Sequence, residues 1–278
     1  MSIWNAIVLG LVKGITEFLP VSSSAHLSIT NNLFDMSTAD NGHIFFEVLL
    51  NLGIFAALCV VYWQELVQMF REILGVMNLG PYAGDQRRHR PGARLFIMLL
   101  LASLPLLLII PIHRFLDSIF DNHIIIGILL VLNGCILFVS DRMKQGTKTE
   151  TNLTVLDSII IGLCQTVGVI PGLSRIGTTV TAGIAAGLRP DFALRFSFLL
   201  SLPVILGADI MDLTEAIRCG IDVASVPAYL LGMLAAMVSG IAVISLFKHF
   251  FSSKGKFKGF AYYCWVMGVL SIILTMIF

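Results

Sequence analysis

Ionisable side chains interrupt two of the most apolar regions of this sequence, and they are the first candidates for chemistry. Lys13, Glu17 and His26 lie in the first region, and Arg175 lies in the second. A charged group among apolar residues is costly to bury, so it usually has a function or a dedicated partner. Lys13 and Glu17 are four residues apart, so a structural ion pair on one helix face is the competing interpretation.

Three serines follow Glu17 and end two residues before His26. A serine hydroxyl is a weak nucleophile without a base, and His26, one helical turn after Ser23, could accept its proton. Glu17 could orient His26, act as the base itself or hold a divalent cation, and the sequence does not choose among these. The competing interpretations are helix capping by the serines and a structural, hydrogen-bonded role for a buried His26.

Both regions contain a candidate helix start that would suit an anion. Ser22, Ser23 and Ser24 precede the second arm of the first region, and the second region contains Gly172-Leu-Ser174-Arg175-Ile-Gly177-Thr178. Free amides at a helix N-terminus bind anions, glycine allows close backbone approach, and arginine offers a fork for phosphate oxygens. We therefore expect Ser22, Ser24 and Gly177 to bind phosphate and Arg175 to clamp it, with a purely structural Arg175 as the competing interpretation.

The rest of the chain is suited to a membrane. Hydrophobic residues make up 57% of it, charged residues 13%, and the mean hydropathy is +0.91; a soluble domain carries about 25% charged residues. A bilayer-spanning helix needs about 20 apolar residues. Six stretches qualify: 44–63, 95–112, 124–140, 192–210, 226–247 and 259–278.

Other classes of protein and site are not indicated. The five cysteines form no CxxC pair, which argues against a disulfide framework or a cysteine metal site. The sequence has no basic stripe with interleaved aromatics, the pattern that would suggest nucleic-acid binding. A cleavable signal peptide is not expected, because Lys13 and Glu17 interrupt the first apolar run.

The two regions that carry the polar motifs, 3–33 and 155–188, are too long for one simple helix and are broken by proline and glycine. We interpret each as a re-entrant hairpin, because irregular backbone at membrane depth must be buried in protein or line a wet cavity. Basic loops should face the cytoplasm. On this rule the loops after Trp63, Ser140 and Phe247 are cytoplasmic, and the mixed or acidic loops around Arg114 and Arg218 are external.

The halves of the chain also resemble each other. The segment 46–52 is similar to 196–202, and the first hairpin is similar to the second around Pro20 and Pro171. We divide a single membrane domain, 1–278, into repeats 1–150 and 151–278, each with one hairpin and three spans. An odd number of spans inverts the second repeat, an architecture typical of transporters. The expected fold class is an all-α polytopic membrane protein with six transmembrane helices and two re-entrant hairpins.

The motifs Glu17-Phe-Leu-Pro-Val-Ser-Ser-Ser-Ala-His26 and Pro171-Gly-Leu-Ser-Arg175-Ile-Gly-Thr178 resemble the two signatures of the bacterial undecaprenyl-diphosphate phosphatases of the bacitracin-resistance type. The resemblance covers essentially the whole chain. It implies hydrolysis of undecaprenyl diphosphate at the outer face of the bacterial cell membrane, which recycles the lipid carrier of cell-wall synthesis. It also implies a divalent cation, Mg²⁺ or Ca²⁺, with Glu17 as a ligand. By position Glu17, Ser23, His26 and Arg175 match the catalytic set, and Ser174 and Thr178 match phosphate ligands.

This chain departs from the family pattern at three positions. Lys13 stands where a second acidic residue is usual, Ala25 stands where glycine often precedes the histidine, and Ile176 replaces a small polar residue. Lys13 could neutralise the diphosphate directly or pair with Glu17. The alternative function is a non-catalytic binder or flippase of polyprenyl phosphate lipids. The sequence leaves the oligomeric state open, and a homodimer is compatible with it.

Overall fold

The structure is a computed structural model, and it describes residues 1–33, 43–79, 90–112, 122–254 and 256–277. Helices are the regular elements of the described residues, apart from one isolated bridge between Lys148 and Leu188. Its elements are α1 (Ile3–Glu17), α2 (Ser23–Leu33), α3 (His43–Val61), α4 (Trp63–Val76), α5 (Pro91–Ser103), η2 (Leu104–Ile112), α7 (His123–Ser140), α8 (Val155–Gly168), α9 (Arg175–Ala185), α10 (Pro190–Cys219), η3 (Val223–Ser225), α11 (Val226–Lys254) and α12 (Lys258–Ile277).

Among the described residues, six helical segments are long and apolar enough to cross a membrane, and each overlaps one predicted stretch. They are His43–Val61, Pro91–Pro111, His123–Ser140, Pro190–Cys219, Val223–His249 and Lys258–Ile277. Many of their large apolar side chains are exposed, which suits contact with lipid. The predicted fold class, an all-α polytopic membrane protein, is therefore confirmed.

The structure adds detail that the hydropathy pattern did not contain. The segment after Trp63, treated above as a loop, forms α4, whose Glu72 accepts bonds from the Gly92 and Ala93 amides at the start of α5. The second predicted span changes from α5 to the 3-10 helix η2 at Leu104. Pro105 supplies the reason, because its ring clashes with the carbonyl four residues earlier and so disfavours continuation of the α-helix.

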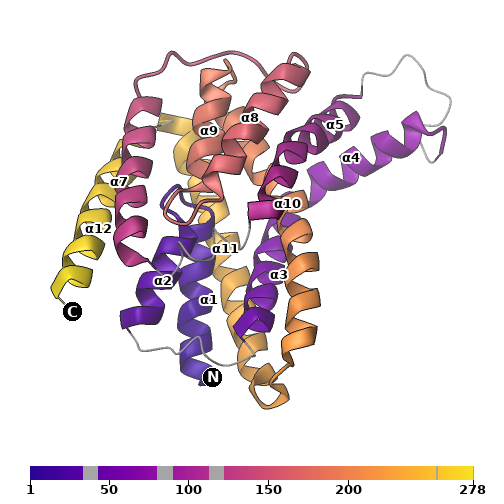
Figure 1. The fold of residues 1–278 in the computed structure, drawn as a ribbon. Helices are drawn as coiled ribbons and strands as arrows, with labels where there is room; N and C mark the ends of the chain where they lie inside the picture. The colour runs from indigo at the N-terminus through magenta and orange to yellow at the C-terminus, as the bar shows by residue number, and fades with distance from the viewer. Residues whose placement is uncertain (34–42, 80–89, 113–121, 255, 278) are drawn as a thin grey trace.

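The two polar regions form hairpins that enter the molecule from opposite ends. In Figure 1, α1 and α2 both open toward the lower end, whereas α8 and α9 both open toward the upper end, and their connecting turns face each other near the middle. Each half contains a hairpin followed by three membrane-length segments in the same order. The division at residues 150 and 151 stays a prediction.

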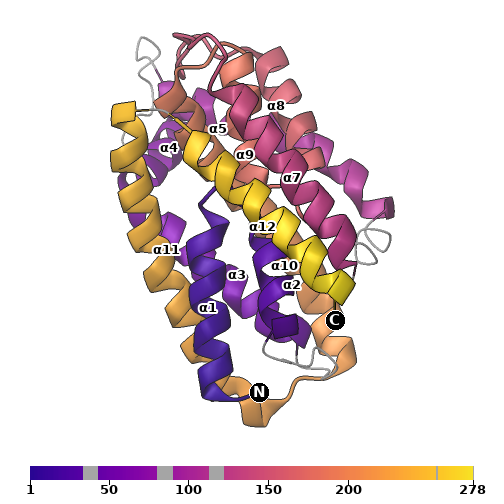
Figure 2. The same ribbon diagram turned by 90° about the vertical axis from the view of Figure 1, so that its left-hand side faces the viewer.

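The basic connections and the more acidic connections lie at opposite ends of the molecule. The α4–α5 region, the α7–α8 connection and the α11–α12 connection gather at the upper end of the molecule, while η3 and the end of α10 lie at the opposite end (Figures 1 and 2). The upper end carries Arg142, Lys144 and Lys256, and the other carries Glu215 and Asp222. This distribution follows the predicted alternation. Arg87, Arg88, Arg114, Asp117 and Asp121, also used in that prediction, lie outside the described residues.

Close helix packing fixes the first hairpin. The helix α1 lies along α11, and a Cβ added at Gly10 or Gly14 would come within 2.2 Å of Gly232 O or 2.1 Å of Ser239 Oγ. Small residues let helices approach closely where lipid removes the hydrophobic driving force between them. The glycines of α1 thus position the face that carries Lys13 and Glu17.

Candidate active site

The turn of the first hairpin, residues 18–22, ends in a strained residue. Ser22 has a φ of 67°, in the left-handed region that non-glycine residues rarely adopt. Its Oγ accepts a bond from the Ala25 amide at 3.4 Å and lies 3.1 Å from Ser24 Oγ. The turn therefore starts α2 and directs Ser23 back toward α1. Strain of this kind persists only where surrounding structure holds it, and it often marks functional sites.

The turn of the second hairpin ends in a conventional helix cap. Ser174 is the N-cap of α9, and its Oγ accepts the Gly177 amide at 3.1 Å. Gly172 has a φ of +99°, and an added Cβ would lie 2.6 Å from Leu129 Cβ. The Thr178 hydroxyl donates to the carbonyls of Ser174 and Arg175, each at 3.0 Å. The hydroxyls of Ser174 and Thr178, two predicted phosphate ligands, are thus bound to their own helix in this structure.

A buried asparagine joins the two turns. Asn133 on α7 donates from Nδ2 to Pro20 O at 2.9 Å and accepts the Ser174 amide on Oδ1 at 3.0 Å. A weaker contact between the Gly172 amide and Ser24 Oγ, at 3.4 Å, also links them. Asn133 has no exposed surface. One amide side chain therefore satisfies backbone groups of both turns and sets their separation.

Four of the predicted residues meet at one carboxylate. Glu17 Oε2 accepts the Ser23 hydroxyl at 2.6 Å and lies 3.1 Å from Lys13 Nζ, while Glu17 Oε1 lies 2.6 Å from Arg175 Nη2. The side chains of Lys13, Glu17 and Arg175 are only 16%, 11% and 15% exposed. Buried charges of this kind are tolerated only when they are paired. The predicted ion pair between Lys13 and Glu17 exists, and the same carboxylate also holds Ser23 and Arg175.

Arg175 keeps unused capacity. Its Nε is buried, and none of the described protein atoms accepts a hydrogen bond from it. A guanidinium presents five donors in a planar fork, so a residue that uses Nη2 on a carboxylate can still offer others to a phosphate. The side chain thus spans the interface between the two hairpins, with one donor on Glu17.

His26 has a different set of contacts. Its Nδ1 lies 2.8 Å from Ser22 O, its Nε2 lies 2.7 Å from Tyr263 OH on α12, and the His26 and Tyr263 rings stack with an interplanar angle of 8°. Both ring nitrogens are therefore engaged, and the hydroxyl of Ser23 donates to Glu17 instead. The sequence left three roles open for Glu17: orienting His26, acting as the base itself, or holding a cation. The hydrogen bond from Ser23 to Glu17 is the contact that the second role requires.

The structure also tests whether these residues suit a divalent cation. Both oxygens of Glu17 already contact a cationic side chain, and no cluster of three or more His, Cys, Asp or Glu occurs in the described ranges. A cation-binding carboxylate should have oxygens free for the metal. The residues present do not fit the expected Mg²⁺ or Ca²⁺ site, so no step below depends on one.

Asn133 and Tyr263 are site residues that the sequence analysis missed. Asn133 is a single amide in an apolar stretch, a signal that exists but is not specific. Tyr263 lies 237 residues after His26, and nothing in its surroundings distinguishes it from other interfacial aromatics. A further polar pair, Asn51 and Asp209, joins α3 to α10 through a bond of 3.0 Å.

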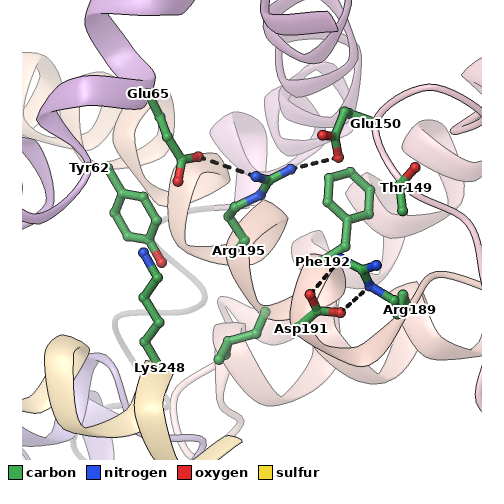
Figure 3. A pocket seen from close by; sticks show the side chains of 10 residues that line it. Tyr62, Glu65, Thr149, Glu150, Arg189, Asp191, Phe192, Arg195 and Lys248 are labelled. Atoms are coloured by element: carbon green, nitrogen blue, oxygen red, sulfur yellow. Dashed lines mark hydrogen bonds and ion pairs between the residues drawn. The ribbon is translucent and has the colours of Figure 1, made fainter. Parts of the chain in front are cut away.

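A separate polar cavity of about 440 Å³ lies where α4, α10 and α11 approach one another (Figure 3). Arg195 bridges Glu150 at 2.7 Å and Glu65 at 3.8 Å, and Arg189 pairs with Asp191 at 2.6 Å. None of the predicted site residues lines this cavity. Its paired charges link α10 to α4 and to the connection before α8, which is a structural role.

Comparison with known proteins covers almost the entire chain. The family model of the bacitracin resistance protein BacA matches residues 6–270. An undecaprenyl-diphosphatase of Desulforapulum autotrophicum is 35% identical, with 98% of each chain covered. Undecaprenyl-diphosphatases of Carboxydothermus hydrogenoformans, 31% identical with 99% and 98% covered, and of Methanobrevibacter smithii, 35% identical with 97% and 96% covered, are also similar. The resemblance drawn from the two motifs is confirmed, and the chain belongs to the BacA family.

Proposed function

We propose that this chain hydrolyses undecaprenyl diphosphate to undecaprenyl phosphate and inorganic phosphate, and so recycles the lipid carrier of cell-wall synthesis. The observation that carries the proposal is the contact of Ser23 with Glu17 beside Arg175, at the meeting point of two hairpins in a membrane protein of the BacA family. The relatives are named as diphosphatases, so a non-catalytic lipid binder or flippase is not favoured.

In the proposed reaction Ser23 is the nucleophile. Its Oγ forms a bond to the terminal phosphorus and its proton passes to Glu17 Oε2, which already accepts that proton in a hydrogen bond. The bond between the terminal phosphorus and the bridging oxygen breaks, and its electron pair leaves with undecaprenyl phosphate. Water then attacks the phosphoserine, the Ser23 oxygen leaves and recovers a proton, and inorganic phosphate is released.

Arg175 stabilises the transferring phosphoryl group in this proposal. As phosphate oxygens enter, the guanidinium engages them with Nε and the second Nη, and its hold on Glu17 Oε1 weakens. The carboxylate then becomes a better proton acceptor at the moment when Ser23 attacks. His26, held by Ser22 O and Tyr263 OH, serves as the acid or base for the water step. Direct attack by water, with Ser23 orienting it, is the mechanistic variant.

Substrate binding and location belong to the same proposal. Lys13, Ser22, Ser24, Ser174, Gly177 and Thr178 surround the phosphates. The chain resides in the bacterial inner membrane with the site toward the outer face. The position of the basic connections at the end opposite to the opening of the first hairpin supports this orientation. The proposal also includes a homodimer, for which no contact between two copies of the chain is available as support.

Purified protein in detergent, supplied with undecaprenyl diphosphate, tests the function. Phosphate release should fall by about a hundredfold or more in Arg175→Ala and in His26→Ala, because each removes charge stabilisation or proton transfer. His123→Ala is the matched control, since His123 contacts Ser28 and lies outside the cluster. A wild-type protein that releases no phosphate with or without Mg²⁺, Ca²⁺ or Mn²⁺ would rule out the enzyme.

A further inference from the structure

Both oxygens of the carboxylate that contacts Ser23 are paired with positively charged side chains. Lys13 Nζ lies 3.1 Å from the same oxygen that accepts the Ser23 hydroxyl, and Arg175 lies on the other oxygen. A metal ion on Glu17 Oε2 would have to sit beside the ammonium group of Lys13. Because all three side chains are largely buried, water would screen this repulsion poorly. The place that a divalent cation would take is held by the lysine.

A second acidic residue lies near Lys13. Asp209 on α10 is close enough to Lys13 to interact with it electrostatically, but its Oδ1 accepts a bond from Asn51 and its Oδ2 accepts no hydrogen bond from the described residues. In the ion pairs around Glu17, Lys13 and Arg175 carry two positive charges against the single negative charge of the carboxylate. Lys13 and Arg175 can therefore offer two positive charges to an incoming diphosphate without any metal ion.

We propose that Lys13 supplies the charge neutralisation that a divalent cation would otherwise provide, so that this chain hydrolyses its lipid diphosphate without a metal. The proposal rests on the proposed function. When the substrate arrives, Lys13 Nζ moves from Glu17 to the oxygens of the diphosphate. It stabilises the electron pair that stays on the bridging oxygen when the bond to the terminal phosphorus breaks. The bond made and the proton transferred are those already given for Ser23 and Glu17.

The first measurement is phosphate release by the full-length protein in detergent with farnesyl diphosphate, in excess EDTA and in Mg²⁺ or Ca²⁺. The proposal expects the same rate in both conditions. A wild-type protein that is active only with a cation overturns the proposal but leaves the proposed function intact. A wild-type protein that is inert in every condition overturns both.

Substitutions at Lys13 give a second, independent test. Lys13→Arg should keep hydrolysis in EDTA, because the positive charge remains. Lys13→Glu should lose about a hundredfold in EDTA and recover when Mg²⁺ is added, because a second carboxylate then faces Glu17 one turn away. Lys144→Glu, the same charge change in an exposed connection, should behave as wild type. Unchanged EDTA-resistant hydrolysis in Lys13→Glu would refute a role for the lysine.

A binding measurement checks the same point without activity. Electron paramagnetic resonance of Mn²⁺ titrated into the protein should show one more bound ion for Lys13→Glu than for wild type. If wild type binds Mn²⁺ tightly and Glu17→Gln removes that ion, the proposal fails. Size-exclusion profiles and thermal unfolding of each variant establish that the comparison is made between folded proteins.

Discussion

At the scale of single residues, the site depends on a few polar side chains with several partners each. Glu17 contacts Lys13, Ser23 and Arg175, and Asn133 bonds to backbone groups of both turns. Apart from Lys13, which shares α1 with Glu17, these partners come from other elements, so Glu17 and Asn133 each fix a distance between elements. A substitution here should therefore affect the geometry of the site as well as the bond that is lost.

The substitution Asn133→Leu tests whether the side chain that joins the two turns maintains the geometry of the site. The change leaves the Ser174 amide buried without its partner and leaves Pro20 O with only a long contact to the Cys264 thiol at 3.8 Å. A buried polar group without a partner costs about 1–3 kcal/mol. We expect a clearly lower unfolding temperature in differential scanning fluorimetry and a lower rate of phosphate release. Gln145→Leu, at an exposed position in the α7–α8 connection, is the control and should leave both unchanged. An Asn133→Leu protein as stable as wild type would show that the bridge contributes nothing.

The residues that the structure brings together at Glu17 were candidates from the sequence, but their contacts were not predictable. Charge in an apolar region identified Glu17 and Arg175, because burial of a charge is costly whatever the fold. The bond from Ser23 to Glu17 depends on the positive φ of Ser22, which no residue type at that position indicates. The contact of His26 with Tyr263 depends on where α12 packs, and one sequence read by itself gives no such pairing.

At the scale of elements, the turns of the hairpins and the packing of the helices place these side chains. The predicted breaks at Pro20 and Pro171 correspond to the ends of α1 and α8, since proline and glycine affect the backbone locally. The helix α4 and the change to η2 were not predicted. Amphipathic helices after a span give weak hydropathy signals, and the pairing of Glu72 with the start of α5 is a tertiary contact.

Alanine substitutions at three glycines distinguish backbone strain from steric overlap. Gly172 lies in the turn of the second hairpin, and Gly207 and Gly220 lie in α10 and at its end. Gly172→Ala should destabilise the protein by more than about 1–2 kcal/mol, because it combines a φ of +99° with a contact at 2.6 Å to Leu129 Cβ. Gly220→Ala has a similar φ, +91°, but no atom within 4 Å, so it should show the strain alone. Gly207→Ala has neither penalty and lies inside α10, where alanine should be neutral or stabilising.

Thermal unfolding of these three variants ranks them, and phosphate release identifies the one that affects the site. We expect a loss of activity for Gly172→Ala alone, because only that turn contacts Ser24 and adjoins Arg175. Equal stability for Gly172→Ala and Gly220→Ala would mean that the overlap with Leu129 is relieved by a small shift of α7. Reduced activity in Gly207→Ala would show that the site responds to changes elsewhere in α10.

At the scale of the whole molecule, hydropathy and charge predicted the number of spans and the sidedness of the connections, whereas they did not predict contacts between single residues. The six spans follow from apolar length, and the separation of basic and acidic connections follows from a rule about membrane insertion. Both are properties summed over many residues, so errors at single positions matter little. The entry of the hairpins from opposite sides was expected from the loop charges and the odd number of spans, and Figure 1 shows them entering from opposite ends.

This arrangement makes a sharp prediction about the two faces of the membrane. Cys219, the last residue of α10, is exposed and lies at the end where the first hairpin opens. If that end faces outward, a membrane-impermeant maleimide added to intact cells should label Cys219, and Cys219→Ser should abolish this labelling. In the Cys219→Ser background, Lys144→Cys at the basic end should react only after the cells are permeabilised. The reverse pattern would place the basic connections outside, contrary to the positive-inside rule. It would also place the opening of the Glu17 hairpin on the cytoplasmic side.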